Sequence, residues 1–599
     1  MAKTMKERKD MDPQYMWDLS TLYKNDEEWN NALPELDEMI KKLPEYQGKV
    51  NNAKTIREFF DFDTHLGRKL SDFYCYASLR NCEDTRDSEA QAMEAKAYQV
   101  YTAYATAISF AEPEILSLDE DVLEAIVHSE DLKPYAFNMQ KLLDQKPHVL
   151  SAKEEALLAA FTETLGAPNK ISESLQDADM TFESVTDSNG EVHELNQSNY
   201  ILLQMSEDRT LRLNAFKSFY KGFKQHINTF AATYNGCIKE AVAEAQVRHY
   251  ESSRAMSMAY EHVPGVVYDS LVDTVRKFMP EMYRYVRLRK QILGLDELHY
   301  YDVYTPLIAG SSKSYTYEEA QQMVLDAVKP LGEDYVNRVK QAYKDRWIDV
   351  YPNNGKRGGA FSSGTYDSNP YILTSFTGTL DSVSTIAHEM GHSQHTWLSN
   401  HTQTPQNADY TLFVAEVAST VNENLLVEQL LQKTTEPKER LALLNHYLEG
   451  FKGTVYRQTM FAEFERDAHA MAERGEAITA ASMNTLYKNL IKDYFGEDLV
   501  IDDEVQYEWA RIPHFYRPFY VYKYATSYCA AVALSEAILN NEEGAVKRYL
   551  EFLSMGGSAY PLDELKHAGV DFSTPEPVSR ALTKFSQILD DVEETLKKL

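Results

Sequence analysis

Apolar residues recur at helical spacing along most of the 599-residue chain. Over 90–111 and 152–165 they return every three or four positions, which predicts amphipathic helices, and Pro113 and Pro168 are expected to interrupt this pattern. Strand-like alternation is rare. The pair Asn189–Gly190 between two short apolar runs is typical of a β-hairpin turn. The pattern therefore predicts a mainly α protein with few strands.

One predicted helix carries two histidines beside its apolar stripe. Asp381 or Ser382 is expected to cap its N-terminus, because an oxygen there can accept backbone N–H groups. His388 and His392 are four residues apart, so both imidazoles lie on one helix face and can reach one metal ion. Glu389 completes the pattern His-Glu-x-x-His. This spacing predicts the catalytic zinc site of a metallopeptidase.

A catalytic zinc ion takes three protein ligands and keeps a position for water, so a third ligand is needed. His395 is seven residues after His388, about 10.5 Å along a straight helix, and is expected beside the ligands or facing substrate. Glu416 interrupts an apolar stretch of the next long helix, where a bare carboxylate is costly to bury unless a metal offsets the cost. Glu423 shares its face, and is either a hydrogen-bond acceptor for a ligand imidazole or a solvated glutamate.

Three other segments allow functional and structural interpretations. Residues 371–376 predict a strand whose edge could pair with an extended peptide. Residues 353–364 lack phosphate-loop spacing and predict a flexible loop, which either moves over a cleft or forms a surface turn. Gly556 and Gly557 either bring backbone close to substrate or end a helix.

Several motifs together resemble the M3 family of zinc oligopeptidases, in particular its oligoendopeptidase F subgroup. They are His-Glu-Met-Gly-His at 388–392, residues 413–419, the aromatic block 513–526, residues 556–558 with 565–571, and the opening 17–23. The resemblance implies a two-lobed helical bowl with a deep central cleft and a small β-sheet beside a zincin-type metal helix. It also implies an N-terminal helical region over 1–200 and a catalytic domain over 201–599.

The resemblance implies that His388, His392 and Glu416 bind one Zn²⁺ ion, and that internal bonds of short peptides are hydrolysed. Glu389 is expected to take a proton from the metal-activated water and then to protonate the leaving amine. Two alternatives remain. A zinc carboxypeptidase would need a basic residue for the terminal carboxylate, and the candidates are Arg511, Arg517 and Lys523. A peptide-binding protein on the same fold would have no need of Glu389.

The aromatic block carries hydrogen-bond donors. His514, Tyr516, Tyr520, Tyr522 and Tyr524 could stabilise the negative oxygen that forms when a peptide carbonyl is attacked. Tyrosines also pack and hydrogen-bond in ordinary helices, and this chain has 40 of them. The resemblance favours His514 and Tyr522 as transition-state contacts and Tyr516 as a substrate contact, while Tyr520 and Tyr524 stay unassigned.

Composition narrows the partners and the compartment. The net charge of −31 disfavours nucleic-acid binding and favours encounter with neutral or basic peptides. The sequence has no apolar run of about 18 residues and no apolar core after its charged opening, so we expect neither a membrane span nor a secretory leader, and a cytoplasmic enzyme. Its four sparse cysteines predict buried thiols. No motif predicts the oligomeric state.

Overall fold

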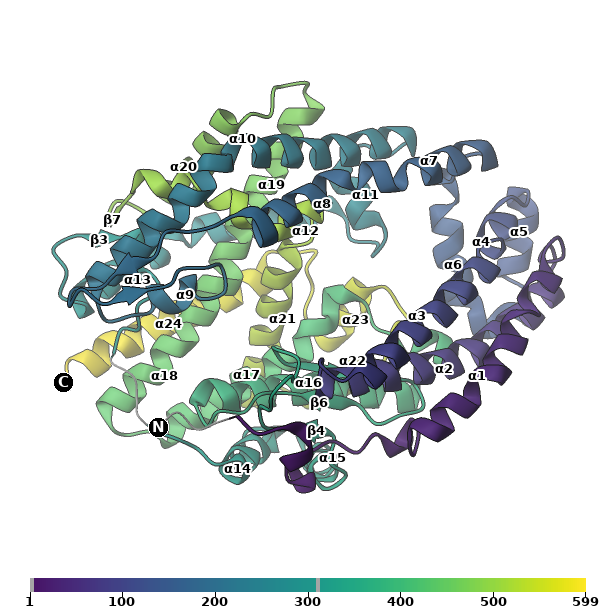
Figure 1. The fold of residues 1–599 in the computed structure, drawn as a ribbon, viewed down its shortest axis with the longest axis horizontal. Coiled ribbons are helices and arrows are strands. Elements are labelled where there is room, and N and C mark those ends of the chain that lie inside the picture. The colour runs from purple at the N-terminus through teal and green to yellow at the C-terminus, as the bar shows by residue number, and fades with distance from the viewer. Residues whose placement is uncertain (1–4, 309–312) are drawn as a thin grey trace. The chain divides into compact units, whose positions relative to one another are not determined.

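The computed structural model describes residues 5–308 and 313–599. Most of these residues lie in helices, as Figure 1 shows, and the strands are short, which confirms the mainly α prediction. The chain forms two compact units, each built from three separate stretches. Unit 1 consists of Met1–Val149, Lys313–Gln429 and Leu534–Gly569, and unit 2 of Leu150–Ser312, Leu430–Ala533 and Val570–Leu599. This division does not coincide with the boundary that the sequence suggests near residue 200.

Unit 1 contains the N-terminal helices, the predicted metal helices and a small sheet. Its helices are α1 (Asp26–Ile40), α2 (Ala53–Glu83), α3 (Ser88–Ile108), α4 (Ala111–Leu116), α5 (Glu120–Val127), α6 (Ala136–Gln145), α14 (Tyr317–Ala327), α15 (Glu333–Lys344), α16 (Leu380–Thr402), α17 (Leu412–Lys433), α22 (Ala545–Leu553) and α23 (Pro561–Ala568). Its strands are β4 (Ile348–Asp349), β5 (Phe361–Ser363) and β6 (Tyr371–Leu373). The last turn of α17 belongs to unit 2.

Unit 2 contains the remaining elements, except that the end of its helix α21, Leu534–Leu539, belongs to unit 1. Its helices are α7 (Ala152–Leu165), α8 (Ala167–Ser174), α9 (Tyr200–Gln204), α10 (Arg209–Val247), α11 (Ser253–Ala259), α12 (Gly265–Lys277), α13 (Met279–Ile292), α18 (Pro437–Gly450), α19 (Arg457–Glu473), α20 (Ala480–Phe495), α21 (Tyr522–Leu539) and α24 (Glu576–Leu596). Its strands are β1 (Val185–Thr186), β2 (Val192–His193), β3 (Leu298–His299) and β7 (Leu499–Val500). The antiparallel pair β1 and β2 confirms the predicted hairpin, and Gly190 adopts φ 84° in its turn.

The sheet of unit 1 supports the metal helix. Its strand order is β4-β6-β5, so β6 confirms the predicted strand but lies in the middle of the sheet. The expectation that this strand offers a free edge to a peptide is wrong, because β4 and β5 pair with both of its edges. The outer strand β5 lies against α16, where the Ser362 and Ser393 hydroxyl oxygens are 2.8 Å apart.

The glycine-containing segment before β5 is held in place over its first half. The Lys356 ammonium group is 2.7 Å from the Asp349 carboxylate and donates to the Tyr351 carbonyl at 2.8 Å. The Arg357 N–H donates to the Cys82 carbonyl of α2 at 3.0 Å. Residues 353–357 are therefore anchored, and the expectation of a flexible loop is wrong for them.

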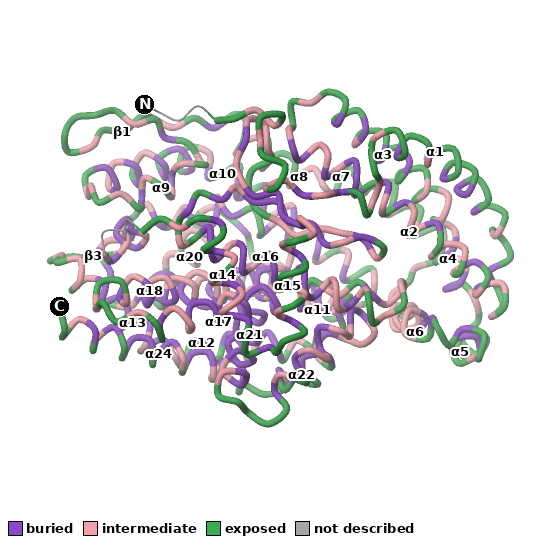
Figure 2. Tube along the Cα trace, turned by 90° about the horizontal axis from the view of Figure 1, so that it is seen from below, coloured by how far each residue is buried: buried purple, intermediate pink, exposed green. Residues whose placement is uncertain are grey.

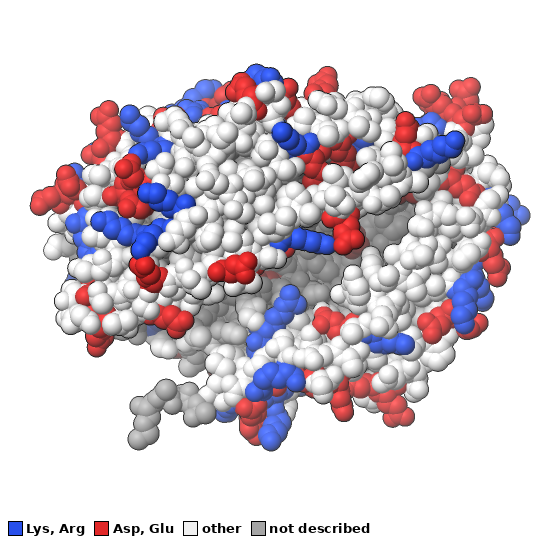
Figure 3. Space-filling model, turned by 45° about the horizontal axis from the view of Figure 1, so that its top comes forward, with Lys and Arg blue, Asp and Glu red and all other residues white. Residues whose placement is uncertain are grey.

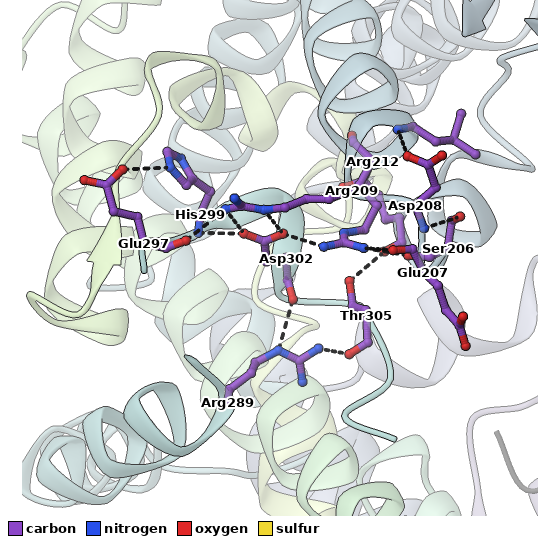
Figure 4. A network of polar contacts seen from close by, with 12 residues as sticks. Ser206, Glu207, Asp208, Arg209, Arg212, Arg289, Glu297, His299, Asp302 and Thr305 are labelled. Carbon is purple, nitrogen blue, oxygen red and sulfur yellow. Dashed lines mark hydrogen bonds and ion pairs between the residues drawn. The ribbon is translucent and has the colours of Figure 1, made fainter. Parts of the chain in front are cut away.

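A buried ionic network organises one end of unit 2 (Figure 4). The Asp302 carboxylate is fully buried and lies 2.7 Å from the Arg212 guanidinium and 2.8 Å from that of Arg209. The Arg289 guanidinium donates to the Asp302 carbonyl at 3.1 Å. The adjacent guanidinium groups outweigh burial and lower the pKa of Asp302, so it stays ionised and joins α10 to α13.

The helices differ in how far they are buried, and charged side chains of both signs lie on the surface. In Figure 2, α17 is buried over most of its length, whereas α1 and α3 are exposed along one side. Acidic and basic side chains are interspersed on the face drawn in Figure 3. All four cysteines are reduced and buried, as predicted. Within 5–308 and 313–599, no helix combines the length and the apolar character that crossing a bilayer requires.

Candidate metal centre

Helix α16 begins two or three residues earlier than the sequence suggests. Thr379 is the N-cap, and its hydroxyl oxygen accepts the Ser382 N–H at 3.1 Å. The prediction of Asp381 or Ser382 as the cap is wrong, because the Ser382 hydroxyl instead accepts the Thr377 N–H at 3.2 Å. Val383, which is fully buried, begins the apolar stripe of α16. The predicted helix and its two faces are otherwise confirmed.

Three donor atoms from α16 and α17 converge in unit 1. The Nε2 atoms of His388 and His392 are 3.2 Å apart. The Glu416 Oε2 atom lies 3.3 Å from each of them. These residues form a group whose donor atoms are close enough to hold one metal ion. The structure thus brings together the three ligands expected from the sequence.

The size of this triangle fits zinc. Ligands bound tetrahedrally at about 2.0–2.1 Å from a zinc ion lie about 3.3 Å from one another. The other nitrogen of His388, Nδ1, is 3.4 Å from the Glu423 carboxylate. If Nδ1 carries the proton and donates it to Glu423, Nε2 presents a lone pair toward His392 and Glu416. A divalent cation satisfies these facing electron pairs.

The electrostatics of the site favour positive charge. Burial disfavours the protonated His388 imidazole, but the Glu416 and Glu423 carboxylates outweigh it and raise the pKa of His388 to about 10. Burial likewise disfavours the ionised Glu416 carboxylate, but hydrogen bonds from His388 and His392 lower the pKa of Glu416 far below its usual range. Glu416 is therefore anionic, and the site attracts either a proton or a metal cation.

A glycine allows the two metal helices to approach closely. A Cβ atom on Gly391 would lie 2.5 Å from the Ala418 carbonyl oxygen and 2.6 Å from the Ser419 Cα. The Asn422 amide of α17 donates to the Ala387 carbonyl of α16 at 3.1 Å. The Ser419 hydroxyl donates to the Glu416 carboxylate at 2.9 Å. Gly391, which directly precedes His392, thus sets the distance across the site.

The connection between α16 and α17 is held by a remote glycine pair. The Gly557 N–H donates to the Asn407 carbonyl at 2.9 Å. A Cβ on Gly556 would lie 2.4 Å from the same oxygen, and one on Gly557 would lie 2.2 Å from the Asp409 carbonyl oxygen. The two glycines thus bring backbone close to other backbone, and the segment that they approach belongs to the chain itself. Their approach to a substrate stays a prediction.

Glu389 is positioned differently from the ligands. It is 6% exposed, and burial raises its pKa. A carboxylate with a raised pKa is a stronger base, so the environment suits proton transfer near neutral pH.

The other histidines of α16 are not part of the donor triangle. His395 is buried, and its ring stacks on Tyr410 with centroids 3.7 Å apart. Burial lowers its pKa to about 3, so it is neutral and packs in the core. The His401 ring stacks on Trp397 at 3.9 Å.

The aromatic block lies in unit 2, where the donors differ in exposure. His514 is exposed, and Tyr520 and Tyr524 are half-buried. Their rings are close: the His514 centroid is 6.2 Å from that of Tyr520 and 6.0 Å from that of Tyr524, and the two hydroxyl oxygens are 3.4 Å apart. The sequence alone assigns neither tyrosine a role, because Tyr520 precedes helix α21 and its place beside Tyr524 depends on the turn before that helix.

Tyr522 and Tyr516 are placed less favourably for substrate contact. Tyr522 is fully buried and packs against Tyr268 with centroids 5.0 Å apart. The Tyr516 hydroxyl lies 2.7 Å from that of Thr233. His514 is thus exposed, whereas Tyr522 lies in the core and the Tyr516 hydroxyl has an internal partner, and the substrate roles expected for these three residues stay predictions.

The basic residues considered for a terminal carboxylate are engaged within unit 2. Arg511 lies 3.5 Å from the Glu508 carboxylate, and Lys523 pairs with Glu261. The Arg517 guanidinium lies over the Tyr520 ring, 4.2 Å from its centroid. Arg511 and Lys523 are thus already neutralised.

The chain is similar to known peptidases along nearly its whole length. Residues 202–584 match the model of peptidase family M3, and residues 114–182 match that of oligopeptidase F. The chain is similar to oligopeptidase PepF of Bacillus subtilis, with 43% identity over 100% of this chain and 90% of that protein. It is 40% identical to group B oligopeptidase PepB of Streptococcus agalactiae, over 99% of this chain and 98% of that protein.

A solved structure is similar as well. The crystal structure of oligoendopeptidase-F from Enterococcus faecium superposes with a TM-score of 0.75 at 36% identity, covering 96% of this chain and 100% of that one.

Proposed function

Because the chain belongs to peptidase family M3 and is a metalloendopeptidase, we propose that it hydrolyses internal bonds of short oligopeptides with one zinc ion. His388, His392 and Glu416 would hold the ion. The observation that carries this proposal is the triangle of donor atoms, with sides of 3.2 and 3.3 Å. A bound zinc ion polarises water and the peptide carbonyl, and lowers the pKa of the water toward about 7.

Glu389 acts as the general base and then as the general acid. Its carboxylate accepts the proton of the attacking water, and the resulting carboxyl group donates that proton to the leaving amine. Its buried position and raised pKa support both steps. Glu423 holds the His388 ring through Nδ1 and so fixes which nitrogen faces the metal.

His514 and Tyr520 supply hydrogen-bond donors to the substrate carbonyl. Both belong to the aromatic block, and their rings are nearly parallel, with an interplanar angle of 4°. Donors held in place before reaction stabilise the developing negative oxygen more than the neutral carbonyl.

The enzyme is further proposed to act on peptides in the cytoplasm. The net charge of −31 and the buried thiols support this setting. A carboxypeptidase is less well supported, since Arg511 and Lys523 have carboxylate partners.

The test combines Glu389→Gln with a matched change on the same helix. Asp381→Asn, at an exposed position of α16, makes the same acid-to-amide change away from the donor triangle. Zinc content and cleavage of an internally quenched peptide with a blocked C-terminus are measured for both variants. Glu389→Gln should retain zinc and lose cleavage by at least about 10²-fold, while Asp381→Asn keeps both.

Chelation should abolish cleavage by the unmodified enzyme, and added zinc should restore it. An active Glu389→Gln enzyme would rule out the assigned base. Loss of cleavage on blocking the peptide C-terminus would favour a carboxypeptidase, and zinc binding without any turnover would favour a peptide-binding protein.

A further inference from the structure

The segment that carries the aromatic donors contains a residue in an unusual backbone conformation. We name residues 513–524 the aromatic turn. Phe519, in its middle, adopts φ 55°, in the left-handed region that bulky residues rarely enter. Its side chain is 1% exposed. Because the backbone angles of Phe519 set the direction in which the chain continues, they determine where Tyr520 and the start of α21 lie.

A buried carboxyl group holds this conformation from the neighbouring helix α19. The Phe519 N–H donates to Glu465 Oε1 at 2.6 Å. Glu465 is fully buried, and its other oxygen, Oε2, has no hydrogen-bond partner among the described residues. Burial raises the pKa of Glu465 well above its usual value, so the carboxyl group is neutral and a glutamine can imitate it.

Weaker contacts complete the support of the aromatic turn. The Ser257 hydroxyl donates to the Pro518 carbonyl at 2.8 Å. The Phe519 ring packs on His469, with centroids 4.6 Å apart, and on Tyr268 at 5.9 Å. None of these groups is one of the proposed hydrogen-bond donors, so the aromatic turn is supported by residues that do not themselves contact the substrate in this proposal.

We propose that Glu465 is a positioning residue, whose hydrogen bond to the Phe519 N–H holds Tyr520 beside His514 and Tyr524. Loss of the acceptor would let Phe519 relax toward an ordinary conformation and would turn Tyr520 away from its neighbours. This inference rests on the proposed function, because the aromatic donors are taken to act on the bound peptide. Since they act at the transition state, their misplacement lowers kcat and leaves KM nearly unchanged.

The experiment compares two substitutions at Glu465 with one at Glu463. Glu465→Gln keeps the oxygen acceptor, and Glu465→Met removes it at similar side-chain length. Glu463 lies two residues earlier on α19, is also buried and pairs with Arg276, away from the aromatic turn. Glu463→Met therefore controls for the loss of a buried carboxyl group from this helix.

Steady-state cleavage, zinc content and thermal unfolding are measured for all variants. Glu465→Met should lower kcat at least tenfold with KM within about twofold, while Glu465→Gln stays within about threefold of the unmodified enzyme. Glu463→Met should change the unfolding temperature without this separation of kcat from KM. A folded Glu465→Met enzyme with unchanged kcat, or a Glu463→Met enzyme with the same kinetic pattern, would overturn the proposal.

A milder variant covers the case in which Glu465→Met does not fold. Ser257→Ala removes the contact with the Pro518 carbonyl and should lower kcat a few-fold at constant KM. An unchanged kcat in folded Ser257→Ala then overturns the proposal. The proposed function is tested separately by Glu389→Gln. The kinetics of the Glu465 and Ser257 variants can be measured whichever group acts as the base, so failure of one proposal can be told from failure of the other.

Discussion

Replacing Gly391 with alanine tests whether the close contact between α16 and α17 sets the metal site. The added Cβ would lie 2.5 Å from the Ala418 carbonyl oxygen, whereas ordinary contact begins at 3.4 Å. The helices would have to separate by about 0.9 Å, the difference between these distances. Because the obstructing atoms belong to the main chain, no side-chain rotation relieves the overlap.

This separation reaches Glu416 directly. Glu416 is two residues before Ala418, and its carboxylate lies 3.3 Å from each imidazole. Zinc sites tolerate deviations of about 0.2 Å, so a shift of about 0.9 Å is several times too large. We expect zinc affinity to fall about 10- to 100-fold. Overpacking costs about 1–3 kcal/mol, and the better helix propensity of alanine returns about 1 kcal/mol, so the variant should remain folded.

Zinc affinity is measured by competition with a chelator of known affinity, and cleavage is followed across the same zinc series. Gly67→Ala in α2 is the matched control, because a Cβ there meets nothing within 4 Å. It should leave zinc affinity unchanged. Gly391→Ala with unaltered zinc affinity and cleavage would refute the view that this contact positions Glu416.

Two further predictions concern Glu423 and Glu564. Glu423→Gln removes the charge 3.4 Å from His388 Nδ1 and should weaken zinc binding about tenfold in the same competition assay, and equal affinity would contradict its supporting role. Burial raises the pKa of Glu564 to about 8, so the folded state keeps a proton that the unfolded state loses above the ordinary value of 4.5. Stability should therefore fall as pH rises from 4.5 to about 8. In urea unfolding, the free energy of unfolding of Glu564→Gln minus that of the unmodified enzyme should be larger at pH 8 than at pH 5 by about 1 kcal/mol or more. The same difference at both pH values would contradict this explanation.

The donor triangle could be predicted because its signals are local. The spacing of His388 and His392 fixes their common face, and an acidic residue in an apolar helix marked Glu416. The zinc-sized triangle follows from a contact at Gly391 that a single sequence does not reveal, since a helix glycine has many uses.

Features that depend on tertiary packing were harder to predict. The Ser382 hydroxyl accepts the Thr377 N–H, and Thr379 instead caps the helix, which begins at Leu380. The order β4-β6-β5 placed β6 inside the sheet, although its own residues are typical of an edge or a central strand alike. Tyr522 begins α21 and is buried, whereas Tyr520 lies before that helix and is half-buried, and the positive φ of Phe519 between the aromatic residues and the helix is not visible in the sequence.

The contact of Gly556 and Gly557 with the connection between α16 and α17 has a consequence for biosynthesis. Its residues belong to the last stretch of unit 1, Leu534–Gly569, yet they hold the connection between the two helices that carry the donor triangle. A ribosome reaches Gly556 only after more than nine-tenths of this 599-residue sequence has been translated. The nascent polypeptide therefore acquires this contact late, after both helices that it connects have been synthesised.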